Sequence, residues 1–415
     1  MATVEVEIAI VGAGVIGLAT ALRLAGEGRE VLLIDPNDPG SGASYGNAGT
    51  VAEYACAPVG TPAILRSIPA LLFNRDSPFA LRWSALYQLA PWLTRFLQQS
   101  FPMPAQANAI ALSELLAAAL PSWEEMAAEA DATDLLNRNG CLYLCRREAD
   151  VAGTAWARSL RSSLGVHQEL LTPQEVATLE PNLPSVEGGG LYFPDSISLT
   201  DPGAMMQKLL KAALARGASV LKARVDKLAS GSRRVHLSGP GCDVSASKVV
   251  IAAGAFSRPL ASQLGDRIPL ETERGYHLEF PMETPLLQRP VSPIDLGFYL
   301  TPMIGRLRVA GTVELAKLTT PVNLRRLAML DRGVRQIFPM LGEPSSRWMG
   351  FRPSLPDSRP VIGPASGNPN VFYAFGHGHI GLTLSAVTAR TIAAFIDGRR
   401  NDSVAEAFSA RRFQP

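Results

Sequence analysis

The opening of the chain contains the feature that most limits what it can fold into. Residues 4–11, VEVEIAIV, end in an apolar run typical of a buried parallel strand, and Gly12-Ala13-Gly14-Val15-Ile16-Gly17 follows directly. An apolar helical pattern comes next, and a second apolar run then ends at Asp35. This order of strand, glycine turn, helix and strand predicts an α/β fold that begins with a doubly wound, Rossmann-type domain.

Each residue of this motif has a physical task in holding a dinucleotide. Gly12 permits the tight turn, Gly14 lets a pyrophosphate approach the backbone at the helix N-terminus, and Gly17 allows close contact between helix and strand. Asp35 can accept hydrogen bonds from ribose hydroxyls. We therefore expect a dinucleotide cofactor, with Val15 and Ile16 also beside it; a coincidental glycine turn is the alternative.

Length and composition limit the remaining possibilities. A chain of 415 residues is too long for one ordinary core, and 47% hydrophobic residues supply enough material for two domains. The net charge of +2 gives no sign of nucleic-acid binding and favours a small-molecule substrate. The four cysteines do not make a disulfide framework. Cys141 and Cys145 share one face of a strand, and we expect reduced thiols and no metal site.

The first residues lack a basic region followed by a long apolar stretch, so we expect them to form a strand and not an export signal. We also expect no apolar run of the ~18 residues that span a bilayer. The most apolar stretch, residues 68–93, is interrupted by Arg75, Asp76 and Arg82. We expect it to form a helical cover on the protein, and contact with a membrane surface is the alternative. The expected location is the cytoplasm, with peripheral attachment to the inner membrane as the alternative.

The order of patterns along the chain predicts two discontinuous domains. Residues 1–51, 195–262 and 345–415 contain the β-α-β patterns and the small-residue turns expected of a cofactor-binding domain. Residues 52–194 and 263–344 combine a helical insertion with a strand-rich region whose alternation predicts an antiparallel sheet for the substrate. There is no solenoid repeat and no low-complexity segment.

Two distant glycine-rich segments indicate which dinucleotide is bound. The first follows Asp35 and suits a loop along a pyrophosphate and toward a flavin; it contains Ser44, Tyr45, Asn47, Ala48 and Gly49. The second precedes a helix near the C-terminus, where free backbone amides stabilise negative charge on a reduced flavin. Its members are Gly376, Gly378, Ile380, Gly381, Leu382 and Thr383. Both segments favour FAD over a nicotinamide cofactor.

Motifs along the whole chain resemble the D-amino acid oxidase superfamily, and within it most resemble bacterial D-amino acid dehydrogenases and D-hydroxyproline dehydrogenases. These motifs are GAGVIG, SYGNAG, LYFPDSISLTDPG, VVIAAGAFS, RGYHLEF, FYLTPM, GFRPSLPDSRPVIG and GHGHIGLTLS. The resemblance implies an FAD-binding domain of the glutathione-reductase kind, with Val225, Ala253 and Gly254 also beside the cofactor. The SYGNAG loop contains no histidine for a covalent link, so we expect FAD to be bound noncovalently.

The resemblance implies a flavoenzyme that oxidises the carbon–nitrogen bond of a small D-amino acid to the imine by hydride transfer to flavin N5. The likeness of SYGNAG and GHGHIG to hydroxyproline-degrading relatives favours D-proline or a hydroxy-D-proline. The electron acceptor is left open among oxygen, a quinone and a partner protein. Alternatives are an enzyme for an N-methyl amino acid such as sarcosine, a non-catalytic flavin-binding subunit of an electron-transfer complex, and a nicotinamide-dependent dehydrogenase.

The same resemblance assigns the substrate-binding residues. Arg352 is expected to bind the substrate carboxylate, because a planar guanidinium presents two parallel donors and keeps its charge. Its alternative is a structural ion pair with an acid such as Asp357. Tyr299 is expected to hold the substrate through its hydroxyl, unless it is a buried sheet tyrosine. Tyr276 and Arg274 are expected to help on a neighbouring strand, with a structural role as the alternative.

Two histidines lie in the C-terminal glycine segment. Histidine is the usual side chain for proton handling near neutral pH. The implied reaction nevertheless needs no dedicated base, because a neutral amine held in line loses hydride directly. We expect His379 to contact substrate or flavin and His377 to pack on the flavin side. The remaining histidines are expected to be surface or sheet residues: His167, His236 and His277.

Overall fold

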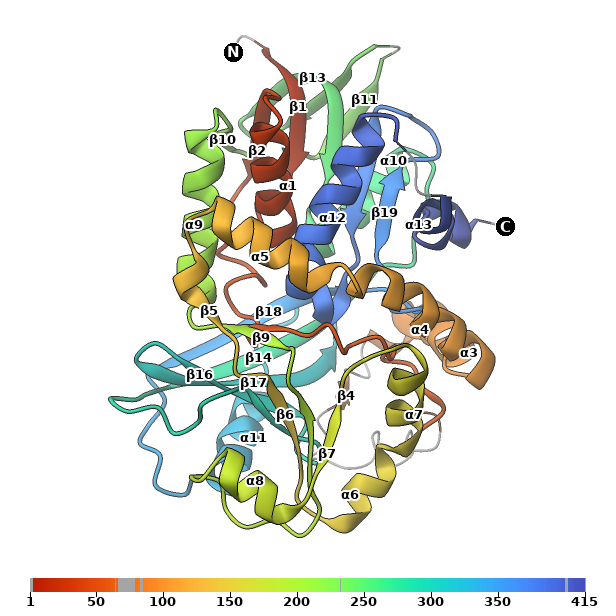
Figure 1. Cartoon of the computed structure of the whole chain (residues 1–415). Helices are drawn as coiled ribbons and strands as arrows, with labels where there is room; N and C mark the ends of the chain where they lie inside the picture. The colour runs from red at the N-terminus through yellow and green to blue at the C-terminus, as the bar shows by residue number, and fades with distance from the viewer. Residues whose placement is uncertain are drawn as a thin grey trace.

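The structure is a computed structural model that describes residues 3–63, 65, 79–82, 85–231, 233–399 and 402–414. These residues form two units, each built on a large sheet (Figure 1). One unit contains the first strand, the N-terminal helix and the C-terminal helices. The other contains the middle of the chain, and the segments at the junction carry the site described below.

The first unit is an α/β domain of the Rossmann type. In the described part of the chain its sheet has eight strands, and neighbours β10, β2, β1, β13 and β20 run parallel. The other strands add antiparallel partners at its edges. The strands are β1 Val4–Val11, β2 Val31–Asp35, β10 Ser219–Lys222, β11 Lys227–Ser230, β12 Val235–Gly239, β13 Cys242–Ile251, β19 Val361–Pro364 and β20 Val371–Phe375.

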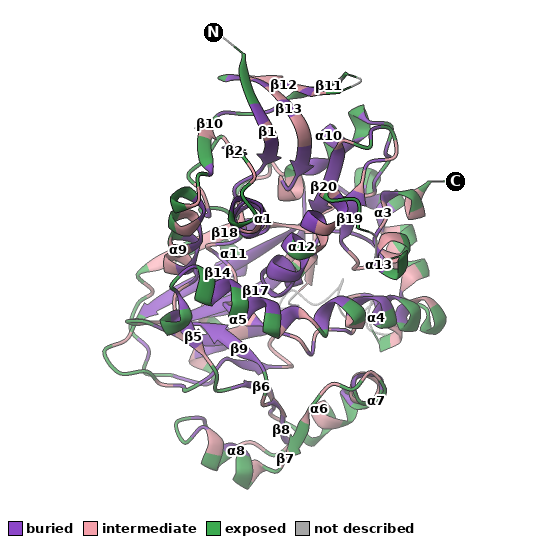
Figure 2. Ribbon diagram, turned by 45° about the horizontal axis from the view of Figure 1, so that its top comes forward, coloured by how far each residue is buried: buried purple, intermediate pink, exposed green. Residues whose placement is uncertain are grey.

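Both faces of this sheet are buried, as its near-continuous apolar strands predict. Ile8 and Ile10 of β1 pack into the cluster formed with the helices of one face, whereas Ala9 and Val11 pack into a second cluster on the other face. Figure 2 shows α12 (Gly381–Ile396) and the central strands as buried and the outer surfaces of α4 (Pro102–Leu116) and α9 (Pro202–Ala215) as exposed. The helices of this unit are α1 Val15–Gly26, α9 Pro202–Ala215, α10 Ser257–Gln263, α12 Gly381–Ile396 and α13 Asp402–Ala407.

The second unit is a mainly antiparallel sheet with helices around it. Among the described residues nine strands belong to it, in the order β18-β14-β17-β16-β15-β6-β8-β7, with β4 beside β17. Their bounds are β4 Phe79–Leu81, β6 Cys141–Cys145, β7 Glu169–Leu171, β8 Gly189–Phe193, β14 Glu271–Pro281, β15 Val291–Pro293, β16 Phe298–Met303, β17 Arg306–Leu315 and β18 Ser346–Ser354. Helix α11, Leu324–Arg335, packs on β14 and β17.

Smaller elements connect the two units. A three-stranded sheet pairs β3 Thr50–Val51 and β5 Leu136–Asn137 with β9 Ile197–Leu199. Helices α4 and α5 pack against α12 of the first unit. The remaining helices are α3 Leu86–Gln99, α4 Pro102–Leu116, α5 Ala119–Glu129, α6 Glu148–Gly153, α7 Ala155–Ser163 and α8 Pro173–Leu179. Single 3₁₀ turns are η2 Thr133–Leu135, η3 Gly254–Phe256, η4 Gly378–Ile380 and η5 Ala410–Phe413.

One expected domain boundary is wrong. We placed residues 345–415 in the cofactor-binding domain, but β18 pairs with β14 over its whole length and is the edge strand of the second sheet. The chain therefore crosses to the first unit only after Ser354. This matters for the site, because β18 carries Arg352.

The longest apolar helix and the four cysteines lie in the interior of the protein. Among the described residues one helix, Gly378–Ile396, is long and apolar enough to cross a membrane, which corrects the expectation that no apolar run reaches that length. Its most apolar window is 67% buried inside the protein, as in the core helix of a folded domain. All four cysteines are free and buried. The described residues contain no cluster of ligands that could hold a metal ion. Residues 66–78, which include much of the apolar stretch expected to form a helical cover, lie outside the described residues.

Candidate active site

The turn after β1 has the close contacts that its three glycines predict. Gly12 has a φ of +106°, in the region that favours glycine, and a Cβ there would overlap the carbonyl of Ala252, which directly follows the neighbouring strand β13. A Cβ on Gly17 would overlap the carbonyl oxygen of Gly12. Gly17 thus holds α1 against the turn. It does not line the cavity described below.

Two polar side chains fix this turn from opposite sides. The backbone N–H of Ala13 donates to Asp35 Oδ2 at 2.8 Å, and the N–H of Val15 donates to Ser44 Oγ at 2.8 Å. Ser44 therefore satisfies one of the free donors at the N-terminus of α1 and brings the SYGNAG loop to it. Gly14 lies between them without a side chain, so the helix N-terminus stays open to an anion.

The SYGNAG loop is held by the second unit through its backbone carbonyls. Buried Arg308 donates to the carbonyl oxygens of Tyr45 at 2.7 Å and Asn47 at 2.9 Å. Thr301 Oγ1 donates to Ala48 O at 2.7 Å, and His277 Nδ1 lies 3.1 Å from Gly46 O. His277, expected to be an ordinary sheet residue, thus helps to fix the loop. The Tyr45 ring packs on Arg308 and does not line the cavity.

The C-terminal glycine segment meets the same loop region in space. Thr383 Oγ1, in the first turn of α12, accepts from the backbone N–H of Ala52 at 2.9 Å. The start of α12 has no side-chain cap, and Ile380, Gly381 and Leu382 face the cavity there. Uncapped N–H groups at a helix N-terminus favour negative charge. Gly376 does not line the cavity; a Cβ there would collide with Leu355.

A single cavity of about 1610 Å³ connects these segments with the second sheet. That exceeds the ~300–1,000 Å³ of an ordinary ligand pocket, so it can hold a large cofactor and a small substrate together. It is lined by most of the residues expected to bind the cofactor: Gly12, Gly14, Val15, Ile16, Asp35, Ser44, Asn47, Ala48, Gly49, Val225, Ala253, Gly254, Gly378, Ile380, Gly381, Leu382 and Thr383. The open N-termini of α1 and α12 suit the pyrophosphate and the flavin of FAD, and Asp35 suits its ribose.

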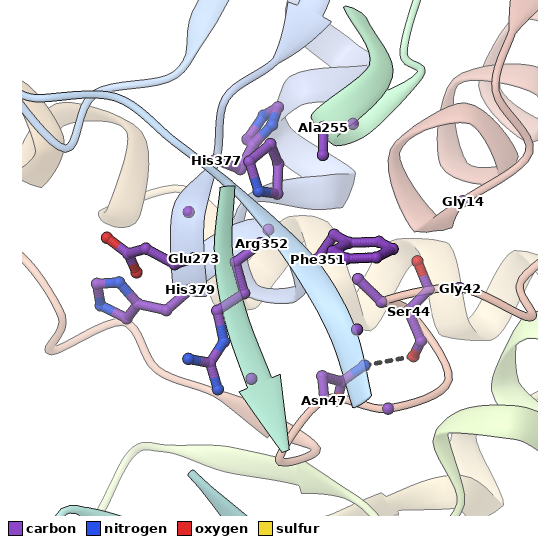
Figure 3. A pocket seen from close by; sticks show the side chains of 18 of the residues that line it. Gly14, Gly42, Ser44, Asn47, Ala255, Glu273, Phe351, Arg352, His377 and His379 are labelled. Carbon is purple, nitrogen blue, oxygen red and sulfur yellow. Dashed lines mark hydrogen bonds between the residues drawn. The ribbon is translucent and has the colours of Figure 1, made fainter. Parts of the chain in front are cut away.

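At the other end of the cavity, strands β14 and β18 pair Glu273 with Arg352, Gly275 with Gly350 and His277 with Trp348. Because side chains alternate along a strand, these three pairs lie on one face, which forms a wall of the cavity. A Cβ on Gly275 would lie 2.5 Å from Arg352 Nη2, so the guanidinium lies over this glycine. Figure 3 shows Arg352, Glu273 and His379 at one end of the cavity and Ser44 and Gly14 at the other.

Arg352 is oriented by an irregularity in β17. Its Nη1 donates to the carbonyl oxygen of Thr312 at 2.9 Å. Thr312 has a φ of +59°, which is unusual for a β-branched residue, and it lies where the pairing of β14 with β17 shifts register. Such strain, of order 1–3 kcal/mol, persists where the surrounding structure fixes it. Here the bulge turns a carbonyl onto the guanidinium.

Tyr299 belongs to a cluster of tyrosines on another wall of the cavity. Its hydroxyl lies 2.9 Å from the Tyr143 hydroxyl and 3.4 Å from that of Tyr54, whose own O–H donates to Cys141 Sγ. Burial raises the pKa of Tyr299 well above its ordinary value, so it stays protonated and can donate a hydrogen bond. Tyr299 and Tyr143 both line the cavity.

The two histidines of the C-terminal segment are neutral. Burial lowers the pKa of His377 to about 3, and its Nε2 lies 3.0 Å from Thr388 Oγ1 inside α12. Burial, followed by the positive charge of Arg352, lowers the pKa of His379 to about 4. The His379 side chain is exposed to the cavity that it lines, inside the body of the protein. Near neutral pH it therefore offers an uncharged imidazole beside the guanidinium.

Tyr276 and Arg274 do not take part, which corrects the expectation that they help at the substrate site. Neither lines the cavity: Tyr276 packs against the core beneath α11, and its hydroxyl donates to Glu314. Arg274 pairs with the same buried carboxylate at 3.0 Å. The alternation of β14 explains this, because residues 274 and 276 face away from residues 273 and 275. The alternative partner considered for Arg352, Asp357, instead pairs with Arg412 and Arg359.

Sequence reasoning missed Glu273, Trp348 and Tyr143. The alternation within ETERGYH was a signal for Glu273, because one face of that strand must carry Glu273 and Gly275 while the other carries Tyr276. Trp348 stacks on His277 with ring centroids 5.1 Å apart and lies over Gly46 and Gly350. No local pattern indicates this packing, because it depends on the pairing of β14 with β18.

Comparisons with known proteins agree with this arrangement. A family model described as FAD dependent oxidoreductase matches residues 7–395. The chain is 35% identical over 417 residues to a "D-amino-acid oxidase" from Bradyrhizobium diazoefficiens, with 98% of each chain covered. It is 33% identical to a "D-amino acid dehydrogenase" from Rhizorhabdus wittichii, covering 95% of this chain and 97% of the relative. The fold is similar to that of glycine oxidase from Geobacillus kaustophilus, with a TM-score of 0.77, 24% identity and full coverage of both chains.

Proposed function

The chain belongs to this family of FAD-dependent oxidoreductases and is an enzyme acting on amino acids, and from that premise we propose that it oxidises the carbon–nitrogen bond of a small D-amino acid. The observation that carries the proposal is the position of Arg352. Its guanidinium lies over Gly275 at the wall of a cavity that continues to the glycine turn of α1 and the open start of α12. A carboxylate bound there would place its α-carbon in the same cavity as the segments expected to hold FAD.

The side chains around Arg352 have separate tasks. Arg352 binds the substrate carboxylate through paired N–H donors, and the Thr312 carbonyl fixes its orientation. The Tyr299 hydroxyl donates a second hydrogen bond to the substrate, and neutral His379 adds contact without a competing charge. Bound FAD supplies the acceptor for the hydride that leaves the α-carbon. Positioning by these residues is the main contribution of the protein.

For the substrate itself we propose a cyclic secondary amine, D-proline or a hydroxy-D-proline. The likeness of the SYGNAG and GHGHIG segments to hydroxyproline-degrading relatives supports this choice. Oxidation of such a ring yields a cyclic imine that keeps its nitrogen, whereas an acyclic D-amino acid releases ammonia after hydrolysis.

Anaerobic reduction of the bound flavin tests the proposal. The purified holoenzyme is mixed with D- and L-alanine, D- and L-proline, hydroxy-D-proline and sarcosine, and bleaching of the flavin absorbance is followed. Bleaching by D-proline with formation of a cyclic imine supports the proposal in full. Bleaching by sarcosine with release of formaldehyde assigns the enzyme to N-methyl amino acids instead. A flavin that no amino acid bleaches contradicts an amino acid-oxidising role.

A further inference from the structure

Glu273 is a buried carboxylate at the cavity wall that the fold leaves without a cationic partner in direct contact. Its exposed fraction is 5%, and its residue lines the cavity on the same face of β14 as Gly275. The other buried acids of this sheet are paired: Glu279 with Arg308 at 2.6 Å and Glu314 with Arg274 at 3.0 Å. Within the described ranges, no lysine or arginine nitrogen lies within 4.0 Å of the Glu273 carboxylate.

Arg352 lies directly opposite Glu273, on β18, and most of its hydrogen-bond donors lack a partner in the described part of the chain. A guanidinium has five N–H donors. Among the residues that the structure describes, only the Thr312 carbonyl accepts from it. Burial lowers the pKa of Arg352 and raises that of Glu273, and each is opposed by the charge of the other. The two charges are thus near enough to influence each other but are not joined by a salt bridge.

Burying a charge without a partner of opposite charge costs free energy. Two such charges in one cavity therefore indicate a ligand that carries an anionic group for Arg352 and a cationic group for Glu273. The neighbouring groups do not supply a charged partner. The Ser354 hydroxyl makes a hydrogen bond to the Glu273 carboxylate but carries no charge. His379 on η4 is neutral because its pKa is lowered to about 4, and Tyr299 on β16 keeps its proton. A molecule with one carboxylate and one ammonium group matches this pattern of one cation and one anion.

We propose that Glu273 binds the amino group of the substrate while Arg352 binds its carboxylate, so that Glu273 makes the site specific for zwitterions over simple carboxylates. The proposal rests on the proposed function and adds a second recognition contact to it. Glu273 and Arg352 are cross-strand neighbours on adjacent strands. The amino group and the carboxylate of the substrate would therefore bind side chains that start about 5 Å apart. Binding both ends of the amino acid fixes the α-carbon between them.

The test compares ligands that differ only in the amino group. Two substrates, D-alanine and D-proline, are paired with their isosteric carboxylates, isobutyrate and cyclopentanecarboxylate. For whichever substrate bleaches the flavin of the wild-type holoenzyme, its dissociation constant is taken from the concentration dependence of anaerobic flavin reduction. The dissociation constant of the matched carboxylate is taken from competition in the same experiment. Both are measured for wild type, Glu273→Gln and the control Glu271→Gln.

Glu271 is a suitable control because it lies on the same strand, pairs with Arg258 at 2.8 Å and does not line the cavity. We expect Glu273→Gln to weaken substrate binding by ~10-fold or more, as loss of a charge-assisted hydrogen bond requires, and to leave carboxylate binding unchanged or tighter. Glu271→Gln should leave both constants unchanged. Retained flavin absorbance and an unchanged thermal midpoint show that each variant is folded.

Two results overturn the inference without touching the proposed function. If Glu273→Gln weakens the substrate and its matched carboxylate equally, Glu273 acts only by orienting Arg352. If it changes neither constant, Glu273 does not contact the ligand. If neither D-alanine nor D-proline bleaches the wild-type flavin, the inference falls together with the substrate class on which it rests.

Discussion

Replacing Gly275 by alanine is expected to displace the substrate clamp without removing its charge. The added Cβ would lie 2.5 Å from Arg352 Nη2 and 2.6 Å from its Cζ, whereas ordinary contact begins at 3.4 Å. The guanidinium must therefore move by roughly 1 Å. Its hydrogen bond to the Thr312 carbonyl, now 2.9 Å long, would then leave the range in which such bonds are strong.

The size of the effect follows from the bonds that lose their geometry. A hydrogen bond to a charged group contributes about 1.5–3 kcal/mol, so misalignment of the clamp should weaken carboxylate binding by roughly 10- to 100-fold. Gly275 does not have a positive φ, so alanine introduces no backbone strain there. The free energy of unfolding should consequently change by less than about 1 kcal/mol.

The assay measures the dissociation constants of isobutyrate and of the best substrate in wild type, Gly275→Ala and Gly342→Ala. Gly342 is a matched control because a Cβ there meets nothing within 4 Å. Urea unfolding and flavin absorbance show whether the fold and the cofactor are retained. Carboxylate binding within about twofold of wild type in folded Gly275→Ala would refute the assignment of Arg352 as the clamp.

Three further changes have defined outcomes. Arg352→Ala should retain flavin but weaken substrate capture by ~2 kcal/mol or more, read from kcat/KM; normal affinity for carboxylates would contradict the assignment. Tyr299→Phe should lower kcat/KM by roughly 5-fold, the effect of one neutral hydrogen bond, and unchanged kinetics would exclude substrate contact. Burial raises the pKa of Glu53 from 4.5 to about 8, so the folded protein holds a proton that the unfolded chain releases, and stability is lost as pH rises from 4.5 to 8. Glu53→Gln should therefore be more stable than wild type by about 3 kcal/mol at pH 7 but not at pH 4.5, as measured by urea unfolding. If the difference in free energy of unfolding is the same at both pH values, it does not come from protonation of Glu53.

Much of the cofactor end of the cavity was predictable because its signals are local. A glycine with positive φ, a helix that begins three residues later and an acid at the end of the next strand are all set by neighbours in the sequence. The lining of the cavity includes most of the residues expected there. The exceptions are Gly17, Tyr45 and Gly376. They do not line the cavity and instead pack against Gly12, Arg308 and Leu355.

The substrate end was less predictable, because it depends on which face of each strand points inward. Tyr276 and Arg274 stand in a motif of the family resemblance, yet they face the core and pair with Glu314. Glu273, one residue earlier than Arg274, faces the cavity instead. A shift of a single position reverses the face, so a correct strand assignment does not by itself identify the site.

The sequence by itself determined the β-α-β unit, its dinucleotide turn and the glycine segment before the last helix, because those depend on backbone freedom and apolar periodicity within a few residues. Tertiary structure decided that β18 joins the second sheet, that Thr312 orients Arg352, and that Glu273 stands opposite it. These contacts join segments 40 to 80 residues apart along the chain, roughly, and their energy comes from pairing and burial that no local pattern records.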